Sequence, residues 1–379
     1  MTFTRERQLE TIRRISRMLG FTAADIVLKR HMKVADFSFD LPPDLIAQFP
    51  PPVRGTSRLL VLDRGTGALT HAQVGDLLQF LSRGDLLVLN DTKVFPARLL
   101  GEREPGGGAV EVLLVCRLDA ERWEALVHPG QRMKPGRRLR FERGGHILHG
   151  EVLAQRFFGR RDIRLWHDEA RSVMDVIEDI GHIPLPPYIK RPDVDLDRDR
   201  YQTVFARASG SIAAPTAGLH FTEALLRELD ASGIDRASIT LHVGYGTFKP
   251  VRVEEVEQHD VDPERYEIPA ADAARINRAL DERRRIVAVG TTSTRALETA
   301  VARGGGHVEA GAAETGLFIY PGYQFRAIGA LVTNFHLPGS SLLMLVCAYG
   351  GRNAVLSAYH EAVRQGYRFY SYGDAMLIR

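Results

Sequence analysis

One stretch of this sequence combines glycine, hydroxyl side chains and a histidine in the way that a binding site for a polar molecule requires. Residues 209–222 hold small, hydroxyl-bearing and glycine residues with one histidine, His220, and no carboxylate. The stretch has no helical or strand period, but it offers backbone N–H groups and hydroxyls to a bound molecule. It runs into a helix predicted over 223–229, which Thr222 caps. Such a loop suits a polar or anionic ligand, and the alternative is a long surface loop.

Four predicted strands end in segments of similar composition. The strands are predicted over 85–89, 237–243, 286–289 and 328–332, and the residues that follow them are rich in Gly, Thr, Ser, Asn and His. A further strand is expected near the C-terminus, over 368–372. Because open α/β sheets keep their ligand sites at the carboxyl ends of strands, these segments predict one composite pocket for a polar ligand with several parts.

The charged and titratable residues of these segments are candidates for chemistry. Arg295 follows a run of glycine and hydroxyl residues at a predicted helix start, where it can hold a carboxylate or phosphate, or lie on the helix surface. His220, His242 and His336 are candidates for proton transfer near neutral pH. They do not form a predicted metal triad, because nothing fixes their separation and no paired carboxylate supports them. Glu267 is an acid or base candidate, or a surface carboxylate.

Composition excludes several classes of protein. The chain has 379 residues, which predicts two or three domains, and its formal net charge is +3, too small by itself to indicate a nucleic-acid binder. Its two cysteines, Cys116 and Cys347, predict neither a disulfide framework nor a zinc site. With no secretory signal and no apolar run of membrane-spanning length, we expect a cytoplasmic protein. No dinucleotide fingerprint, phosphate-loop lysine motif or nucleophile elbow is present.

The order of predicted elements divides the chain. Residues 96–170 contain short alternating runs separated by Gly and Pro turns, which predict a small inserted antiparallel β-barrel. Residues 32–95 and 171–379 form the expected α/β core, with three layers. Residues 1–31 are an N-terminal extension with a basic amphipathic helix over 11–19; it is a dispensable leader if Met32 is the natural start, or else a targeting or RNA-contacting arm.

Two basic segments lie beside the predicted core. The barrel carries Arg132, Lys134, Arg137, Arg138, Arg140, Arg143, Arg156, Arg160, Arg161 and Arg164, opposed nearby by Glu142, Glu151 and Asp162. This excess can neutralise phosphates or simply be a solvated strand face. The proline-stiffened segment 182–192 adds Tyr188 and two cations, and it either stacks on a base and contacts phosphates or serves as a rigid linker.

The motifs in these segments resemble those of one family, the S-adenosylmethionine:tRNA ribosyltransferase-isomerases of queuosine biosynthesis. The resemblance covers about 32–379, and its motifs are specific to that family. They are residues 90–94 with 97–98, 182–189, 201–205, 213–221, 241–248, 290–292 with Arg295, 333–338 and 372–376.

The resemblance implies an α/β core with an inserted β-barrel and a defined reaction. The ribosyl unit of S-adenosylmethionine is transferred and isomerised onto 7-aminomethyl-7-deazaguanine at the tRNA wobble position, giving epoxyqueuosine and releasing adenine and methionine. The expected partners are therefore tRNA and S-adenosylmethionine, the latter as ribosyl donor, with no further cofactor, no metal and no membrane. We expect a monomer.

Site roles follow as hypotheses from this chemistry. His220 and His336 are the first candidates for proton transfer, and His242 and Glu267 rank second. Arg295 would hold the methionine carboxylate, while residues 213–219 and 290–292 would surround the ribose. The predicted substrate-binding residues are Asn90, Thr92, Lys93, Arg98, Tyr188, Arg191, Ala213, Pro215, Thr216, Gly218, Gly244, Gly246, Thr247, Gly290, Thr291, Thr292, Arg295, Thr333 and Asn334.

Two other classes of protein fit parts of the pattern. An RNA methyltransferase would also use S-adenosylmethionine, but it would release S-adenosylhomocysteine instead of free adenine. A non-catalytic RNA-binding protein built around the basic barrel would bind tRNA whether or not S-adenosylmethionine is present, and it would release no methionine.

Overall fold

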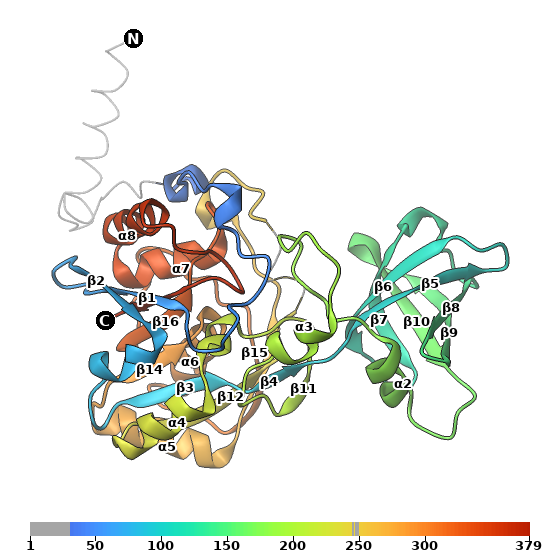
Figure 1. Ribbon diagram of the computed structural model, residues 1–379. Coiled ribbons are helices and arrows are strands. Elements are labelled where there is room, and N and C mark those ends of the chain that lie inside the picture. Colours follow the sequence, from blue (N-terminus) through green and yellow to red (C-terminus); the bar gives the residue numbers. More distant parts are fainter. Residues whose placement is uncertain (1–30, 245, 247–249) are drawn as a thin grey trace, which may run out of the picture.

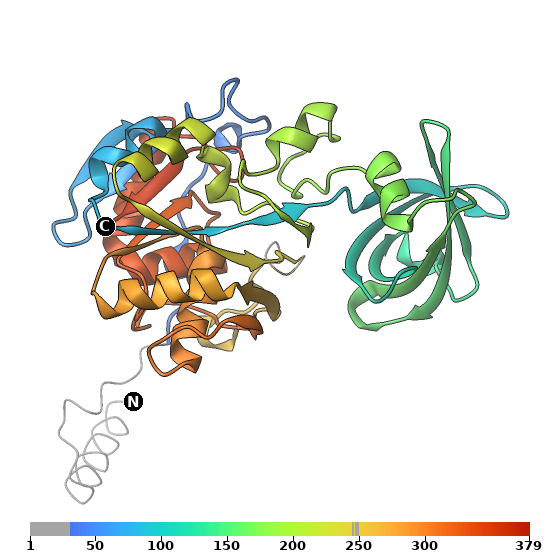
Figure 2. The same cartoon turned by 90° about the horizontal axis from the view of Figure 1, so that it is seen from below.

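The computed structural model describes residues 31–244, 246 and 250–379. The predicted helix over 11–19 and nearly all of the predicted extension 1–31 lie outside these residues, as does Thr247. Two lobes are visible, an α/β core that holds both ends of the described chain and a smaller β-barrel joined to it by a narrow connection (Figures 1 and 2).

The described residues of the core form a mixed nine-stranded sheet. Strands β12, β3, β14 and β16 are parallel neighbours in its middle, so their carboxyl ends lie at one edge. Strands β13 and β15 extend the sheet on one side, and β17, β1 and β2 on the other. In sheet order the strands are β15 (Gly311–Thr315), β13 (Glu264–Ile268), β12 (Asp235–Leu241), β3 (Leu86–Asn90), β14 (Ile286–Val289), β16 (Ala330–Asn334), β17 (Ala375–Ile378), β1 (Arg58–Leu62) and β2 (Leu69–Gln73).

Helices cover both faces of this sheet, which confirms the predicted three-layer α/β core. Side chains alternate along each buried strand: Leu86 and Val88 of β3 pack into one apolar cluster, whereas Leu87 and Leu89 pack into another on the opposite face. The first cluster includes residues of α5 (Ala270–Asp281), α6 (Thr291–Arg303), α7 (Ser341–Gly350) and α8 (Arg352–Arg364). The second includes residues of α4 (Glu223–Ala231) and of the 3-10 helices η3 (Val74–Phe80) and η6 (Thr216–His220).

The second lobe is a closed antiparallel barrel, as predicted. Its strands are β5 (Arg98–Glu104), β6 (Ala109–Arg117), β7 (Arg122–His128), β8 (Arg138–Arg143), β9 (His146–Gln155) and β10 (Arg160–Trp166). At Gly101 a side chain would collide with the backbone of Arg140, so the barrel needs glycine where these strands approach. Helix α2 (Val173–Ile180), just beyond the predicted insertion 96–170, adds Val176, Ile177 and Ile180 to the barrel's apolar core.

Short elements complete the chain and join the lobes. Strand β4 (Thr92–Val94) pairs in parallel with β11 (Ala208–Ser211) in the connection between core and barrel, next to α3 (Asp195–Arg200). The backbones of Arg98 and His182 exchange two hydrogen bonds of 3.1 and 2.8 Å there. The remaining 3-10 helices are η1 (Val34–Phe37), η2 (Pro43–Leu45), η4 (Gly130–Arg132), η5 (Phe157–Gly159) and η8 (Val256–Gln258).

Two local predictions were wrong. The C-terminal strand is β17 and not residues 368–372, because the Asp374 carboxylate accepts hydrogen bonds from the backbone N–H of Arg58 and Arg368 and folds the preceding residues into a turn. Helix α6 begins at Thr291, so the hydroxyl residues that were expected to precede the helix already belong to it. Its hydroxyls are compatible with a helix because they bond back four residues, as Ser293 does to the carbonyl of Val289 at 2.7 Å.

Within the described residues, no single helix combines the length and apolar character needed to cross a membrane. Helices α7 and α8 reach that length and composition only when taken as a pair, with a bend of 115° between them.

Candidate active site

A cavity of about 520 Å³ opens at the carboxyl ends of the central parallel strands. Its walls come from parts of the chain that lie far apart in sequence, among them the start of α6, the segment that leads into η6, and the segment that runs from the end of β16 into α7. The cavity therefore occupies the place that sheet topology predicts for a ligand.

The cavity brings together many residues that the sequence singled out. The predicted site residues among its walls are Tyr188, Ala213, Pro215, Thr216, Gly290, Thr291, Thr292, Thr333, Asn334 and His336. None of its described wall residues is an aspartate, glutamate, lysine or arginine. Binding of a polar molecule there depends on hydroxyls, amides and backbone groups.

Other predicted residues lie in the connection or deeper in the core. Asn90 donates to the carbonyl of Leu241 at 2.9 Å, and the hydroxyl of Thr92 contacts Nδ1 of His242 at 2.8 Å. Gly218 lies in η6 where a side chain would meet Thr203 and Phe205 at 2.7 and 2.8 Å, so close packing already requires glycine there. Lys93 is exposed on β4, and Glu267 is exposed on the sheet strand β13.

Further predicted residues line neighbouring hollows. Arg98 and Arg191 line a groove between the lobes. Gly246 and Arg295 line a small second cavity together with Glu264. The backbone N–H of Gly244 donates to that Glu264 carboxylate at 3.2 Å. The structure thus places part of the predicted set in three hollows and the rest outside them.

Arg295 and Glu264 form a buried ion pair, with side chains 8% and 5% exposed. Arg295 lies in α6 and Glu264 at the start of β13, and the guanidinium donates directly to the carboxylate. The Nε of Arg295 has no hydrogen-bond partner among the described residues. The charge of Arg295 is therefore already balanced within the protein.

Asn334 links the cavity wall to His220. Its Nδ2 donates to the carbonyl of Tyr370 at 2.9 Å and contacts Nε2 of His220 at 3.1 Å. A carbonyl only accepts, so this arrangement fixes the amide orientation and requires Nε2 of His220 to accept, which places the His220 proton on Nδ1. Oδ1 of Asn334 is buried and has no hydrogen-bond partner among the described residues.

The histidines near the cavity are neutral at physiological pH. Burial lowers the pKa of His220 to about 4 and that of His336 to about 3. Nε2 of His336 contacts the hydroxyl of Thr333 at 2.8 Å. His220 does not line the cavity and reaches it through Asn334, whereas His336 lies in its wall. Burial also lowers the pKa of His242, which packs against Gly210 away from the cavity.

The N-terminus of α6 faces the cavity without a capping side chain. Gly290 precedes the helix with φ of +96°, a conformation that favours glycine, and no side chain accepts from the first N–H groups. Gly290, Thr291 and Thr292 all line the cavity. The start of α7, also in the wall, is capped by Ser340, whose hydroxyl accepts from Leu343 N at 3.2 Å. The positive end of α6 is thus the stronger site for a carboxylate.

Sequence reasoning missed Tyr370 and Ser371, which also line the cavity. The hydroxyl of Tyr370 is buried without a partner among the described residues, and its ring lies 4.0 Å from that of Tyr188 between centroids. Both residues were assigned to a strand, although the Gly373-Asp374 pair that follows is a typical turn signal. Among the described residues, no cluster of three His, Cys, Asp or Glu side chains could hold a metal ion.

The basic excess of the barrel is smaller than its sequence indicates. Arg140 pairs with Glu142, Arg156 with Asp162, and Arg164 with Glu121 at 2.8 Å. The sequence analysis did not count acids such as Glu121 against these arginines, because they lie far from them in sequence and meet them only across the barrel. Arg132, Lys134 and Arg138 have no ion-pair partner among the described residues and lie together at the turn into β8.

The lowered histidine pKa values predict acid-sensitive stability. An unfolded histidine has a pKa near 6.5, so between pH 6.5 and the folded values near 4 and 3 the unfolded state binds more protons. The contribution of the two neutral histidines to the free energy of unfolding is therefore complete above pH 6.5, and it is lost as the pH falls towards the folded pKa values. We expect each histidine to remove about 2 kcal/mol from the free energy of unfolding between pH 7 and pH 5.

Urea unfolding at pH 7, 6 and 5 measures this loss. The His336→Asn variant should show a shallower decline than the wild-type protein, by about 2 kcal/mol over the same interval. Equal declines in the two proteins would show that His336 is not held neutral by burial.

An α/β core with a polar cavity at its strand ends and an inserted barrel defines a two-lobed α/β enzyme. The family model described as "Queuosine biosynthesis protein" matches residues 34–378. The chain is 51% identical over 348 residues to the S-adenosylmethionine:tRNA ribosyltransferase-isomerase of Symbiobacterium thermophilum, covering 92% of this chain and 100% of that protein. The corresponding enzyme of Acetivibrio thermocellus is 48% identical over 349 residues, with the same coverage.

A solved structure agrees with these sequence comparisons. The S-adenosylmethionine tRNA ribosyltransferase of Thermotoga maritima is 35% identical, with a TM-score of 0.50, and the match covers 91% of this chain and 100% of that one. The chain therefore belongs to the queuosine biosynthesis protein family, and the family resemblance inferred from its motifs is confirmed.

Proposed function

We propose that this enzyme transfers and isomerises the ribosyl unit of S-adenosylmethionine onto 7-aminomethyl-7-deazaguanine at the wobble position of tRNA. The products are epoxyqueuosine in the tRNA, free adenine and methionine. The observation that carries this proposal is the cavity in which the family's motifs 213–217, 290–292 and 333–338 meet at the strand ends. The relatives' name supports the same reaction.

The cavity offers a partner for each part of S-adenosylmethionine. The methionine carboxylate suits the uncapped N–H groups of Thr291 and Thr292 at the positive end of α6. The adenine suits the pair of rings of Tyr188 and Tyr370, which offers an aromatic surface for stacking. In this arrangement Arg295 supports the site through Glu264 instead of binding the carboxylate that the sequence suggested for it.

The chemistry needs proton transfers but little charge from the protein. The positive sulfonium acidifies the adjacent ribose carbon, so a neutral base can remove a proton there. The C–N bond to adenine then breaks, and a donor must protonate or hydrogen-bond the departing base. The free amine of the deazaguanine forms the new C–N bond. An oxygen of the ribosyl unit then attacks the carbon that carries sulfur, so that the C–O bond of the epoxide forms as the C–S bond breaks and methionine leaves as a neutral thioether. No cofactor besides the ribosyl donor is required in this scheme.

His336 is our candidate for proton transfer within the cavity. It lies in the wall and is neutral, so its ring offers one N–H donor and one acceptor nitrogen to the reacting groups without carrying a charge into the site. His220 does not line the cavity and contacts it only through Asn334, so it is a positioning residue in this scheme. His242 and Glu267 are set apart from the cavity walls and rank below both.

The partners and location of the enzyme follow from the same proposal. The macromolecular substrate is tRNA, and the exposed cations Arg132, Lys134 and Arg138 are positioned to contact its phosphates. We propose that the enzyme acts as a monomer, and that it acts in the cytoplasm because its proposed substrate is tRNA.

Product analysis tests the reaction. The enzyme is incubated with S-adenosylmethionine and tRNA that bears the deazaguanine precursor, and small molecules and nucleosides are analysed by mass spectrometry. We expect epoxyqueuosine with equimolar adenine and methionine, and at least a 100-fold lower turnover for His336→Phe with S-adenosylmethionine still bound. S-adenosylhomocysteine would indicate a methyltransferase instead, and tRNA binding without any product would indicate a non-catalytic protein.

A further inference from the structure

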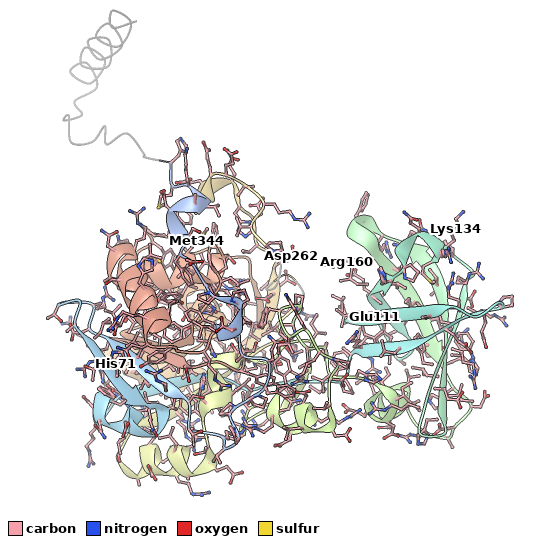
Figure 3. All side chains as sticks on the ribbon, turned by 45° about the horizontal axis from the view of Figure 1, so that its top comes forward. His71, Glu111, Lys134, Arg160, Asp262 and Met344 are labelled. Atoms are coloured by element: carbon pink, nitrogen blue, oxygen red, sulfur yellow. The ribbon has the colours of Figure 1, made fainter. Side chains whose placement is uncertain are left out.

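A second large hollow lies between the two lobes. This interlobe groove has a volume of about 600 Å³. One wall is the outer surface of β5 and β6, and the other is the proline-rich segment 182–193. The groove-lining residues that the argument uses are Arg98, Leu100, Leu113, Pro187, Lys190 and Arg191. Figure 3 shows Glu111, which also lines the groove, on the side of the barrel nearer the core.

The groove and the active-site cavity share a wall. Pro187 lines both hollows. Its neighbour Tyr188 lines the cavity, and Ile212 of the groove is followed directly by Ala213 of the cavity. The groove therefore lies directly beside the cavity, with Pro187 between them.

Contacts between the lobes hold the two walls in place. The backbones of Arg98 and His182 are joined by hydrogen bonds of 3.1 and 2.8 Å at the base of the connection. Nη2 of Arg160 in the barrel lies 3.7 Å from Oδ2 of Asp262 in the core, and Figure 3 shows these side chains facing each other across the gap between the lobes. The groove is thus largely preformed, which lowers the entropy lost when something binds in it.

The chemistry of the groove suits an unstacked nucleotide. Leu100 is 41% exposed on one wall, and four prolines, Pro184, Pro186, Pro187 and Pro192, stiffen the other. Most charges nearby are balanced, because Arg98 binds Glu111 through two contacts of 2.8 Å and Arg191 binds Asp197. The exposed ammonium of Lys190 has no ion-pair partner among the described residues. An apolar slot with one free cation fits a base whose phosphate lies at the rim.

We propose that the interlobe groove binds the nucleotide next to the wobble nucleotide while the wobble base reaches into the cavity. This inference rests on the proposed function, since it takes tRNA as the substrate. A base that reacts inside an enclosed site must leave its stack, and the chain that follows it needs a path. The groove provides that path, with Leu100 and the prolines against the neighbouring base and Lys190 near its phosphate.

Blocking the groove tests the proposal. Leu100→Trp fills the groove from an exposed position, and Leu118→Trp places the same side chain at another exposed leucine of the barrel that does not line it. We expect Leu100→Trp to raise KM for the tRNA about tenfold, with the dissociation constant for S-adenosylmethionine unchanged. Leu118→Trp should leave both constants within twofold of the wild-type values. An unchanged KM in Leu100→Trp would overturn the proposal.

A charge variant checks the phosphate contact without touching the apolar wall. Lys190→Ala should weaken tRNA binding and reduce the slope of log affinity against log salt by about one unit. Arg227→Ala, which removes an exposed charge from α4, should change neither. An unaltered salt slope in Lys190→Ala would contradict a phosphate at the groove rim.

An abasic anticodon stem-loop identifies the occupant. Stem-loops that lack the base on either side of the wobble position are compared with the intact stem-loop, using wild-type enzyme and Leu100→Trp. We expect one abasic position to raise KM for the wild type about tenfold and to have little further effect in Leu100→Trp. If the KM increase caused by the missing base multiplies with the increase caused by Leu100→Trp at both abasic positions, neither base occupies the groove. The proposed function fails separately, if wild-type enzyme releases no adenine with intact tRNA.

Discussion

Replacing Arg295 by methionine is expected to lower the free energy of unfolding by about 3–5 kcal/mol. The change leaves the Glu264 carboxylate buried without the guanidinium that faces it. A buried charge without its partner retains its desolvation penalty, although methionine fills much of the arginine volume. Urea unfolding of the two proteins at pH 7 measures the difference.

The matched control removes both charges. The double variant Arg295→Met/Glu264→Met should recover most of the lost stability, because an apolar pair of similar volume replaces the ion pair. An additive loss in the double variant would contradict the view that the two side chains mainly balance each other. The backbone N–H of Gly244, which donates to Glu264, limits how complete the recovery can be.

The same double variant separates a structural from a ligand-binding role for Arg295. If the methionine carboxylate binds at the N-terminus of α6, the folded double variant should bind S-adenosylmethionine within a few-fold of the wild-type affinity. A loss of 100-fold or more, about 2.7 kcal/mol, would instead assign the carboxylate to Arg295, as the sequence suggested.

Replacing Asn334 by alanine is expected to lower kcat at least 100-fold. Asn334 is the residue through which the cavity, His220 and the turn at Tyr370 are joined. Its loss leaves the Tyr370 carbonyl and His220 Nε2 without their donor. Steady-state kinetics with saturating tRNA and S-adenosylmethionine measure the effect.

A second, half-buried asparagine provides the control. Asn277 makes a comparable pair of contacts, with Nδ2 to the Val308 carbonyl at 2.9 Å and Oδ1 accepting from the Val308 N–H, but it does not line the cavity. Both Asn→Ala variants should lose about 1–3 kcal/mol of stability, and the kcat of Asn277→Ala should stay within a few-fold of wild type. Similar kcat values in the two variants would show that Asn334 is merely structural.

Much of the fold was predictable because its signals are local. The buried strand β3 is apolar at every position from Leu86 to Leu89, and the barrel strands alternate with period two. The hydroxyl and glycine segments after β14 and β16 indicated the site, because parallel strands bring such segments to one edge.

Features that depend on distant partners could not be predicted. Arg295 resembles a ligand-binding arginine until Glu264, 31 residues earlier, is brought against it by β13. The three histidines have similar local sequences, yet His336 lines the cavity, His220 lies behind Asn334, and His242 contacts Thr92 in the connection. Tyr370 lies in the cavity wall because the hydrogen bonds of Asp374 fold the chain into a turn before β17.

Crystallography of the enzyme with S-adenosylmethionine is the most direct test of the central claim, that the strand-end cavity holds the ribosyl donor. We predict ligand density between Pro215, Gly290 and His336, with the methionine carboxylate at the N–H groups of Thr291 and Thr292. Density elsewhere, with the carboxylate on Arg295 and the strand-end cavity empty, would contradict the account.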